Sequence, residues 1–282
     1  MAETDSKMEA LTPSEILEKA SSVGVTKANL PFRKIVILSI LAGMYIAFGA
    51  VFASVVATGM TGVWPYGFMK LLQGFVFSLG LILVVVGGAE LFTGNSLMVI
   101  AWASRKISFL KLLRNWGIVY LGNFIGSLLV VALILISKEY SASNGMLGSV
   151  MLSTAHAKIQ YGFWQALALG VLCNILVCLA VWLAWSGRST TDKILAIILP
   201  ITLFIAAGFE HSVANMYIIP LGVLLKWVDP GFISSLSVSL DLSNLTWGSF
   251  LLKNLLPVTL GNILGGGFFV GLLYFWGYRK KD

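Results

Sequence analysis

Long apolar runs constrain this chain more than any other feature. They occupy residues 35–58, 68–103, 112–137, 160–187, 193–226 and 248–278. A helix that spans a bilayer needs roughly 20 apolar residues, so four runs fit one tilted helix each, whereas 68–103 and 193–226 are far too long. The composition agrees, because 58% of the residues are hydrophobic and 11% are charged, against about 25% charged in soluble domains. The sequence predicts an all-α membrane protein with six transmembrane helices.

The basic residues predict the orientation of these helices. If the N-terminus is inside, 14 of the 19 Lys and Arg residues lie on the inner side, and the positive-inside rule then places both termini in the cytoplasm. We expect a cytoplasmic N-terminal segment (1–34) with a short amphipathic helix, a six-helix transmembrane channel domain (35–278) and a cytoplasmic tail (279–282). The net charge of +7 forms no continuous stripe, so no nucleic-acid partner is expected.

A helix start precedes the first apolar run. In TPSE, Thr12 is a suitable N-cap, Pro13 a suitable first residue, and Glu15 completes a capping box. The apolar side of this helix comprises Ile16, Leu17 and Ala20. Such a helix can lie on the membrane surface or pack on the bundle, and the alternative is a gate beneath a pore.

The sequence repeats itself. GAELFTGN at Gly88–Asn95 aligns without gaps on GFEHSVAN at Gly208–Asn215, and LLRNWGIVYLGNFIG at Leu112–Gly126 aligns on LLKNLLPVTLGNILG at Leu251–Gly265. Each repeat carries three spans, an odd number, so the two copies enter the membrane from opposite sides. The sequence therefore predicts two inverted three-helix repeats, an architecture of transporters. Glycines at GxxxG-type spacing are assigned to close helix packing: Gly122, Gly126, Gly261, Gly265, Gly267 and Gly271.

The repeat explains the two long runs. Each becomes two half-helices joined by a non-helical break near the bilayer midplane, so the second and fifth helices are broken at the matched motifs. Such backbone is stable only where protein or a watery cavity covers it. The second half-helices should begin near Gly94 and Ser212, and their N-termini carry partial positive charge that favours anions.

Glu210 and His211 lie inside the second break. Glu90 occupies the place of Glu210 in the first half, so we expect the Glu210 carboxylate to bind loose backbone amides. Leu91 holds the position of His211, so the histidine breaks the symmetry. Ionisable residues within membrane helices are functional candidates by default.

Neither a metal site nor an enzyme is expected. Adjacent Glu and His side chains point to different helix faces, and the other histidine, His156, falls in a predicted outer loop. No Ser or Cys has a recognisable base or oxyanion motif around it. We therefore expect no metal, no cofactor and no catalytic residue.

These motifs resemble the formate–nitrite transporter family. The resemblance rests on the two breaks, on LGNILGGG at Leu260–Gly267 and on SGRSTTDK at Ser186–Lys193. It implies an aquaporin-like protomer of six spans, a homopentamer in the bacterial cytoplasmic membrane, and a separate substrate pathway through each protomer. The implied cargo is formate and related small monocarboxylate or inorganic anions, together with protons.

The resemblance also implies roles for individual residues. His211 resembles the family's central pore histidine, Thr93 the hydroxyl opposite it, and Lys158 a lysine of the outer vestibule that attracts anions. Asn174 resembles a polar residue that steadies the break, and Glu210 belongs to the same pathway. The apolar constrictions correspond to Leu81, Leu91 and Phe204, with Phe77 and Val177 nearby. Without the resemblance, ordinary helix packing would account for these apolar positions, and a solvated loop charge for Lys158.

Simple acid–base chemistry connects the pathway residues. A bare carboxylate inside hydrocarbon costs many kcal/mol unless it is paired or neutralised. Formate, as a simple carboxylate, has a pKa of about 4, and an unperturbed histidine about 6.5, so His211 could lend a proton and recover it. We expect Lys158 and the helix N-termini to attract the anion, and Thr93 and His211 to bind it. Passage as neutral acid and passage as an anion beside charged His211 both stay open.

Three classes of function fit the sequence. The first is a monovalent-anion channel for formate, with nitrite, acetate, lactate or hydrosulfide as related cargo. The second is a channel for neutral solutes such as water or ammonia, which would not need Lys158 or two positive helix ends. The third is a membrane scaffold or receptor with a sealed core, which predicts no permeation.

Overall fold

The computed structural model describes residues 9–236 and 241–279. Most of these residues are helical, and none of them forms a strand. Residues 1–8 of the expected N-terminal segment and 280–282 of the expected tail lie outside the described residues. The prediction of an all-helical membrane protein is confirmed.

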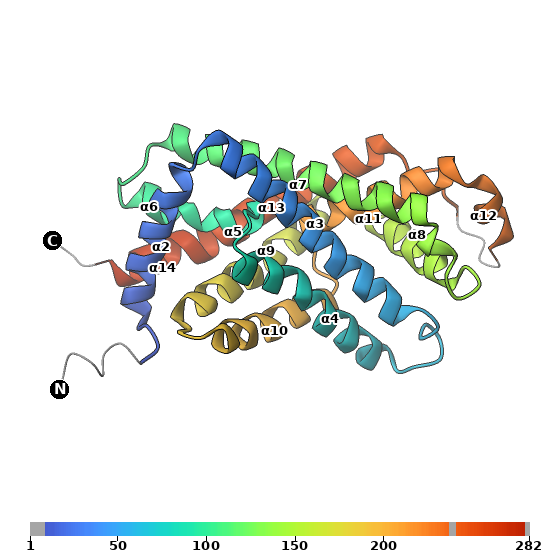
Figure 1. Ribbon diagram of the computed structural model, residues 1–282, viewed down its shortest axis with the longest axis horizontal. Helices are drawn as coiled ribbons and strands as arrows, with labels where there is room; N and C mark the ends of the chain where they lie inside the picture. The colour runs from blue at the N-terminus through green and yellow to red at the C-terminus, as the bar shows by residue number, and fades with distance from the viewer. Residues whose placement is uncertain (1–8, 237–240, 280–282) are drawn as a thin grey trace.

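The helices form an elongated bundle, with α2 and α14 side by side at one end and α12 at the other (Figure 1). The first half contains α2 (Pro13–Ala28), α3 (Phe32–Ala57), α4 (Tyr66–Gly87), α5 (Phe92–Asn95), η1 (Ser96–Met98), α6 (Val99–Ala103) and α7 (Phe109–Ser137). The second contains η2 (Glu139–Ser141), α8 (Met146–Lys158), α9 (Phe163–Ser186), α10 (Thr190–Ala206), α11 (Ser212–Val228), α12 (Pro230–Ser235), η3 (Ser249–Leu255), α13 (Leu256–Ile263), η4 (Leu264–Leu272) and α14 (Leu273–Tyr278).

Within the described residues, five continuous helices are long and apolar enough to cross a membrane. They are α3, α4, α7, α9 and the run Ser249–Tyr278. The predicted fifth span is divided into α10 and α11, of 17 residues each, and neither is long enough alone.

Both long apolar runs are interrupted at the matched motifs. Helix α4 ends at Gly87 and the next helix begins at Phe92, whereas α10 ends at Ala206 and α11 begins at Ser212. The first of these starts differs from the predicted Gly94 by two residues, and the second agrees. Gly88 (φ 80°) and Gly208 (φ 73°) adopt the left-handed conformation just after α4 and α10. Glycine adopts this conformation without a Cβ penalty, which is why it commonly ends helices.

The N-terminal helix α2 has the predicted start and packs on the bundle. The amide and the hydroxyl of Thr12 each donate to Glu15 Oε2 at 2.7 Å. Its predicted apolar side is buried, comprising Ile16, Leu17 and Ala20. The helix contacts η1, α6 and α9.

Helix α8 corrects the prediction of an outer loop for residues around 156–158. It has only modest hydrophobicity, but it packs against α11 and buries Leu147, Met151, Leu152 and Ala155. Helix α8 precedes α9 in the chain as α2 precedes α3. Each carries a lysine at its C-terminal end, Lys158 in α8 and Lys27 in α2. This likeness between α2 and α8 lies outside the segments that match in the sequence.

Glycines let the long helices approach closely. A Cβ added to Gly126 on α7 would collide with the carbonyl oxygen of Ile40 on α3, and one on Gly265 would collide with that of Val171 on α9. Gly122, Gly261 and Gly271 are similarly restricted, as predicted. At Gly267 the nearest atom, Val99 Cγ1, is 3.6 Å away, which is ordinary contact.

Gly126→Ala should therefore destabilise the protein by about 1–3 kcal/mol, because a backbone carbonyl cannot move away without separating α3 from α7. Gly117→Ala is the matched control on α7, since nothing lies within 4 Å of its added Cβ. Thermal unfolding of the two purified variants in detergent measures the difference. Equal melting temperatures would contradict the assignment of Gly126 to backbone contact.

Candidate functional site

Thr93 and His211 meet where the two helix breaks come together. Thr93 lies in the first turn of α5, and His211 is the residue before α11. Thr93 Oγ1 and His211 Nε2 are 2.9 Å apart, and the two side chains are 0% and 3% exposed. The structure thus brings one polar group from each half into a buried pair.

The backbone determines which nitrogen of His211 carries the proton. The amide of Ala214 donates to His211 Nδ1 at 3.0 Å, so the ring caps the N-terminus of α11. An amide can only donate, so Nδ1 carries no hydrogen and the neutral ring is protonated on Nε2. His211 therefore donates to Thr93, and the hydroxyl hydrogen of Thr93 is left available to another acceptor. A second proton on Nδ1 would displace the Ala214 amide.

Apolar side chains enclose this pair. The ring of Phe204 stacks on His211 with centroids 5.9 Å apart, and Phe77 meets Phe204 edge-on at 5.5 Å. All the residues expected at the constrictions are buried in one hydrophobic cluster: Phe77, Leu81, Leu91, Val177 and Phe204. Charge is costly in such surroundings because few groups replace its hydration.

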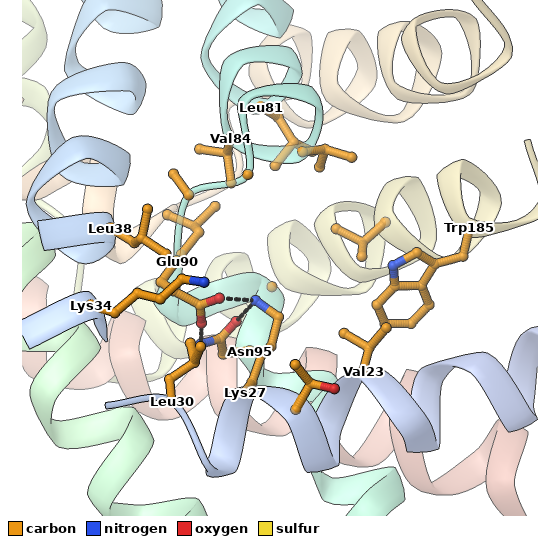
Figure 2. A pocket seen from close by; sticks show the side chains of 17 residues that line it. Val23, Lys27, Leu30, Lys34, Leu38, Leu81, Val84, Glu90, Asn95 and Trp185 are labelled. Carbon is orange, nitrogen blue, oxygen red and sulfur yellow. Dashed lines mark hydrogen bonds and ion pairs between the residues drawn. The ribbon is translucent and has the colours of Figure 1, made fainter. Parts of the chain in front are cut away.

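A cavity of about 370 Å³ leads from α2 toward this centre. Figure 2 shows its wall, with Leu81 and Val84 of α4 on one side and Lys27 of α2 on the other. Leu91, the last residue of the first break, also lines it, so the cavity extends as far as the segment that leads into Thr93. Helix α2 thus both packs on the bundle and covers the cavity.

Glu90 anchors the first break through a buried network (Figure 2). Lys27 Nζ lies 2.7 Å from Glu90 Oε1 and 2.9 Å from Asn95 Oδ1. Asn95 Nδ2 donates to Glu90 Oε2 at 2.7 Å and to Asn115 Oδ1 at 2.8 Å, and Asn115 Nδ2 donates to the Lys27 carbonyl at 3.2 Å. The network joins α2, the break and α7.

Glu210 anchors the second break in the same way. Lys158 Nζ lies 2.7 Å from Glu210 Oε1, and Asn215 and Asn254 donate to Glu210 Oε2 at 2.7 and 3.0 Å. Asn254 also donates to the Lys158 carbonyl at 2.9 Å. Two differences separate the halves. Asn254 donates to the glutamate carboxylate, which Asn115 does not, and Asn215 Oδ1 has no hydrogen-bond partner among the described residues. Lys158 lies beside the second break as the ion-pair partner of a glutamate, and its role in attracting anions stays a prediction.

Asparagines, and not the glutamate carboxylates, bind the loose backbone at the breaks. Asn123 Oδ1 accepts from the amide of Phe92, and Asn262 Oδ1 from the amide of Ser212, both at 2.9 Å. Each asparagine also donates to the carbonyl oxygen of the break glutamate, at 2.9 and 3.0 Å. The prediction that the Glu210 carboxylate binds backbone amides is wrong, since its partners are the side chains of a lysine and two asparagines.

Asn174 lies buried between the halves. Its Nδ2 is 2.6 Å from the carbonyl oxygen of Asn262, 3.2 Å from that of Thr93 and 3.3 Å from Ser96 Oγ. These contacts connect α5 and η1, which follow the first break, to α13. Its role in steadying the first break stays a prediction.

The sequence did not predict structural roles for Lys27 or for the asparagines of α7, η3 and α13, which are Asn115, Asn123, Asn254 and Asn262. The asparagines did leave a signal, because Asn115 and Asn254 occupy equal positions in LLRN and LLKN, and Asn123 and Asn262 in the two LGN triplets. Lys27 lies outside both matched segments, so nothing in the repeat indicated it. Within the described ranges, no three His, Cys, Asp or Glu side chains are grouped to bind a metal ion.

Lys158→Met should destabilise the protein by about 3–5 kcal/mol, because it leaves the 1% exposed Glu210 carboxylate without its cation. The double variant Lys158→Met, Glu210→Gln removes both charges and should recover much of that loss. Thermal unfolding in detergent measures both variants. If the double variant were as unstable as the single one, the ion pair would not be the source of the effect.

The comparisons with known proteins agree with this architecture. The family model described as formate/nitrite transporter matches residues 14–276. The formate channel FocA of Escherichia coli (strain K12) is 44% identical over 99% of this chain and 98% of its own. A probable formate transporter of Methanothermobacter thermautotrophicus is 36% identical over 96% of this chain and 98% of its own. A solved pentameric formate channel with formate bound superposes with a TM-score of 0.83 at 45% identity, covering 88% of this chain and 98% of that chain. The chain is therefore a multi-pass membrane protein of the formate/nitrite transporter family.

Proposed function

We propose that this protein is a channel that carries formate across the membrane. Its family, and the formate channels that it matches over nearly their whole length, support this cargo. The observation that carries the proposal is the Thr93–His211 pair, which supplies hydrogen-bonding groups inside an apolar enclosure, and Leu81 and Leu91 of that enclosure also line the cavity. A small molecule with a carboxyl group can accept from such donors.

The proposed architecture is an aquaporin-like protomer of six spans in two inverted repeats. The matched networks at Glu90 and Glu210 support the repeat, and the broken helices supply the second and fifth spans. Residues 35–278 form the channel domain in this proposal. The segments that precede and follow it in sequence, 1–34 and 279–282, both lie in the cytoplasm. A homopentamer in the bacterial inner membrane, with one pathway in each protomer, follows the pentameric relative.

The charges favour passage as neutral formic acid. Lys27 and Lys158 are each ion-paired with a glutamate at 2.7 Å, so neither presents an isolated positive charge to the pathway. A formate anion would lose its hydration between Phe77, Leu91 and Phe204 without gaining a counter-ion. Neutral acid avoids this cost, and one proton then moves with each formate.

His211 supports this passage as a hydrogen-bond donor. In the neutral ring, Nε2–H donates to Thr93 Oγ1, and the hydroxyl can turn its hydrogen toward a carboxyl oxygen in the pathway. If His211 instead gave a proton to formate, the ring would first need a proton on Nδ1. That state would cost the hydrogen bond from Ala214 at 3.0 Å.

His211→Asn tests whether the ring must carry charge. Asparagine is a good N-cap, so its Oδ1 can accept from Ala214 while its Nδ2 donates toward Thr93, but it does not titrate. We expect formate uptake into liposomes within roughly tenfold of wild type, the cost of one weakened hydrogen bond. We also expect uptake to keep its rise toward low pH, because formic acid becomes about tenfold more abundant per pH unit above its pKa of about 4.

Uptake by the His211→Asn variant that no longer depends on pH would show that the histidine itself supplies the proton. His211→Phe removes both hydrogen bonds and serves as the comparison. Undiminished uptake with unchanged pH dependence in His211→Phe would remove the histidine from the mechanism.

Thr93→Ala should lower formate uptake, because it removes the acceptor of His211 Nε2–H and the hydroxyl that faces the cargo. A loss of roughly 10- to 100-fold corresponds to about 1–3 kcal/mol for an unsatisfied buried group. Thr93→Ser keeps the hydroxyl and should retain most of the uptake. Size-exclusion profiles show whether both variants remain folded. Equal uptake by Ala and Ser variants would contradict a role for the hydroxyl.

A panel of labelled solutes separates the other candidates in the same liposomes. Faster uptake of nitrite or hydrosulfide than of formate would change the principal cargo within the family. Passage of water or ammonia without formate would indicate a neutral-solute channel. No permeation of any solute would indicate a sealed scaffold.

A further inference from the structure

The turn between α6 and α7 gathers cations around a surface hollow of about 460 Å³. The hollow is lined by Trp102, Arg105, Lys106, Ile107, Ser108 and Lys111. Arg105, Lys106 and Lys111 are exposed, and Arg114 adds another exposed cation one turn along α7. The turn lies at the end of the bundle that carries α2 (Figure 1).

Within residues 9–236 and 241–279, the two ion pairs are those of Lys27 and Lys158, so no carboxylate there forms a salt bridge with Arg105, Lys111 or Arg114. Lys106 shares a second hollow with a single carboxylate residue, Glu18. The side-chain partner of Lys111 is a neutral one, Asn29 Oδ1 at 2.6 Å. The hollow therefore keeps a net positive charge that an anion can satisfy.

The backbone holds the cations in a fixed arrangement. Arg105 adopts φ 57°, a left-handed conformation that costs a non-glycine residue roughly 1–2 kcal/mol. Two backbone hydrogen bonds hold this conformation. The amide of Arg105 donates to the Trp102 carbonyl at 2.8 Å, and the amide of Lys106 donates to the Ala101 carbonyl at 2.9 Å. Helix α7 begins at Phe109 beside the hollow, and its N-terminus adds positive potential.

Apolar side chains flank the same hollow. Trp102 is 40% exposed, and its ring lies 5.7 Å from that of Phe109, which is 51% exposed. Leu110 is 77% exposed. Tryptophan is enriched where a membrane meets water, and these neighbours continue onto the transmembrane helix α7. An acidic soluble protein would account for the cations, but an amphipathic anion accounts for the cations and the apolar flank together.

We propose that this turn binds the phosphate headgroup of an anionic phospholipid. Arg105, Lys106 and Lys111 contact the phosphate, and the acyl chains lie along Phe109 and Leu110. Basic pockets beside transmembrane helices are known to recognise anionic lipid headgroups by this combination of charge and hydrocarbon contact. The inference does not rest on the cargo of the channel.

The test compares lipid retention by the full-length protein in native mass spectrometry. Purified protein in detergent is titrated with phosphatidylglycerol and, separately, with zwitterionic phosphatidylcholine. The variant is Arg105→Gln, Lys106→Gln, because Gln tolerates the left-handed position no worse than Arg. The matched control is Arg188→Gln, Lys193→Gln, which removes one cation from the α9–α10 connection and one from the first turn of α10, at the same end of the bundle.

Wild type and control should retain phosphatidylglycerol in preference to phosphatidylcholine. The Arg105, Lys106 variant should bind phosphatidylglycerol roughly 30-fold more weakly, the effect of two surface cations. Its unfolding temperature in lipid-free detergent and its formate uptake in phosphatidylcholine liposomes should be unchanged, which separates this result from failure of the proposed channel function.

Four outcomes would overturn the proposal. The first is unchanged phosphatidylglycerol binding by the variant, and the second is an equal loss in the control, which would indicate bulk charge only. The third is displacement of the lipid by inorganic phosphate at constant ionic strength, which would indicate a site for a free anion. A wild type without lipid preference would also overturn it and favour an acidic protein partner.

Discussion

A carboxylate among membrane helices is stable only when a cation and N–H donors surround it, and Glu90 and Glu210 both meet this requirement. Each receives a lysine ammonium at 2.7 Å and an asparagine amide at 2.7 Å. The lysine comes from the helix that precedes a span, and the asparagine from the helix that follows the break. Removing the carboxylate would leave a partly buried lysine unpaired, so neither charge can be lost alone. The pairs therefore determine where α2, α8 and the two breaks lie.

The breaks also need replacements for helical hydrogen bonds, and Asn123 and Asn262 supply them. Each side chain accepts from the first amide of the following half-helix and donates to a carbonyl in the break. An amide side chain is suited to this task because it carries a donor and an acceptor side by side. Protein groups thus replace part of the hydrogen bonding that the non-helical backbone lacks. Its rigidity holds Thr93 and His211 at hydrogen-bonding distance although they are 118 residues apart.

Much of this arrangement could be predicted because it repeats. The match of GAELFTGN to GFEHSVAN located both breaks, and the left-handed glycines explain why the motif begins where a helix must end. Helix α8 was missed because its 13 residues are too short and too weakly hydrophobic to stand out from a loop. The partners of the glutamates were missed for a different reason. Lys27 lies 63 residues from Glu90 and Lys158 lies 52 residues from Glu210, and no local pattern reports contacts over such separations.

The symmetric scaffold carries an asymmetric centre, and this asymmetry bears on selectivity. In the aligned motifs Leu91 occupies the position of His211, and Val213 occupies the position of Thr93. Each half therefore contributes one polar and one apolar side chain. All four are almost fully buried. A second histidine and a second hydroxyl in place of Leu91 and Val213 would offer enough donors and acceptors to stabilise water there. A single hydrogen-bonded pair within an apolar shell instead suits one small molecule that can form hydrogen bonds and bears no charge. In the formate pathway proposed above, the same restriction would make the protonation state of the cargo, and not the charge of the lysines, the property on which passage depends.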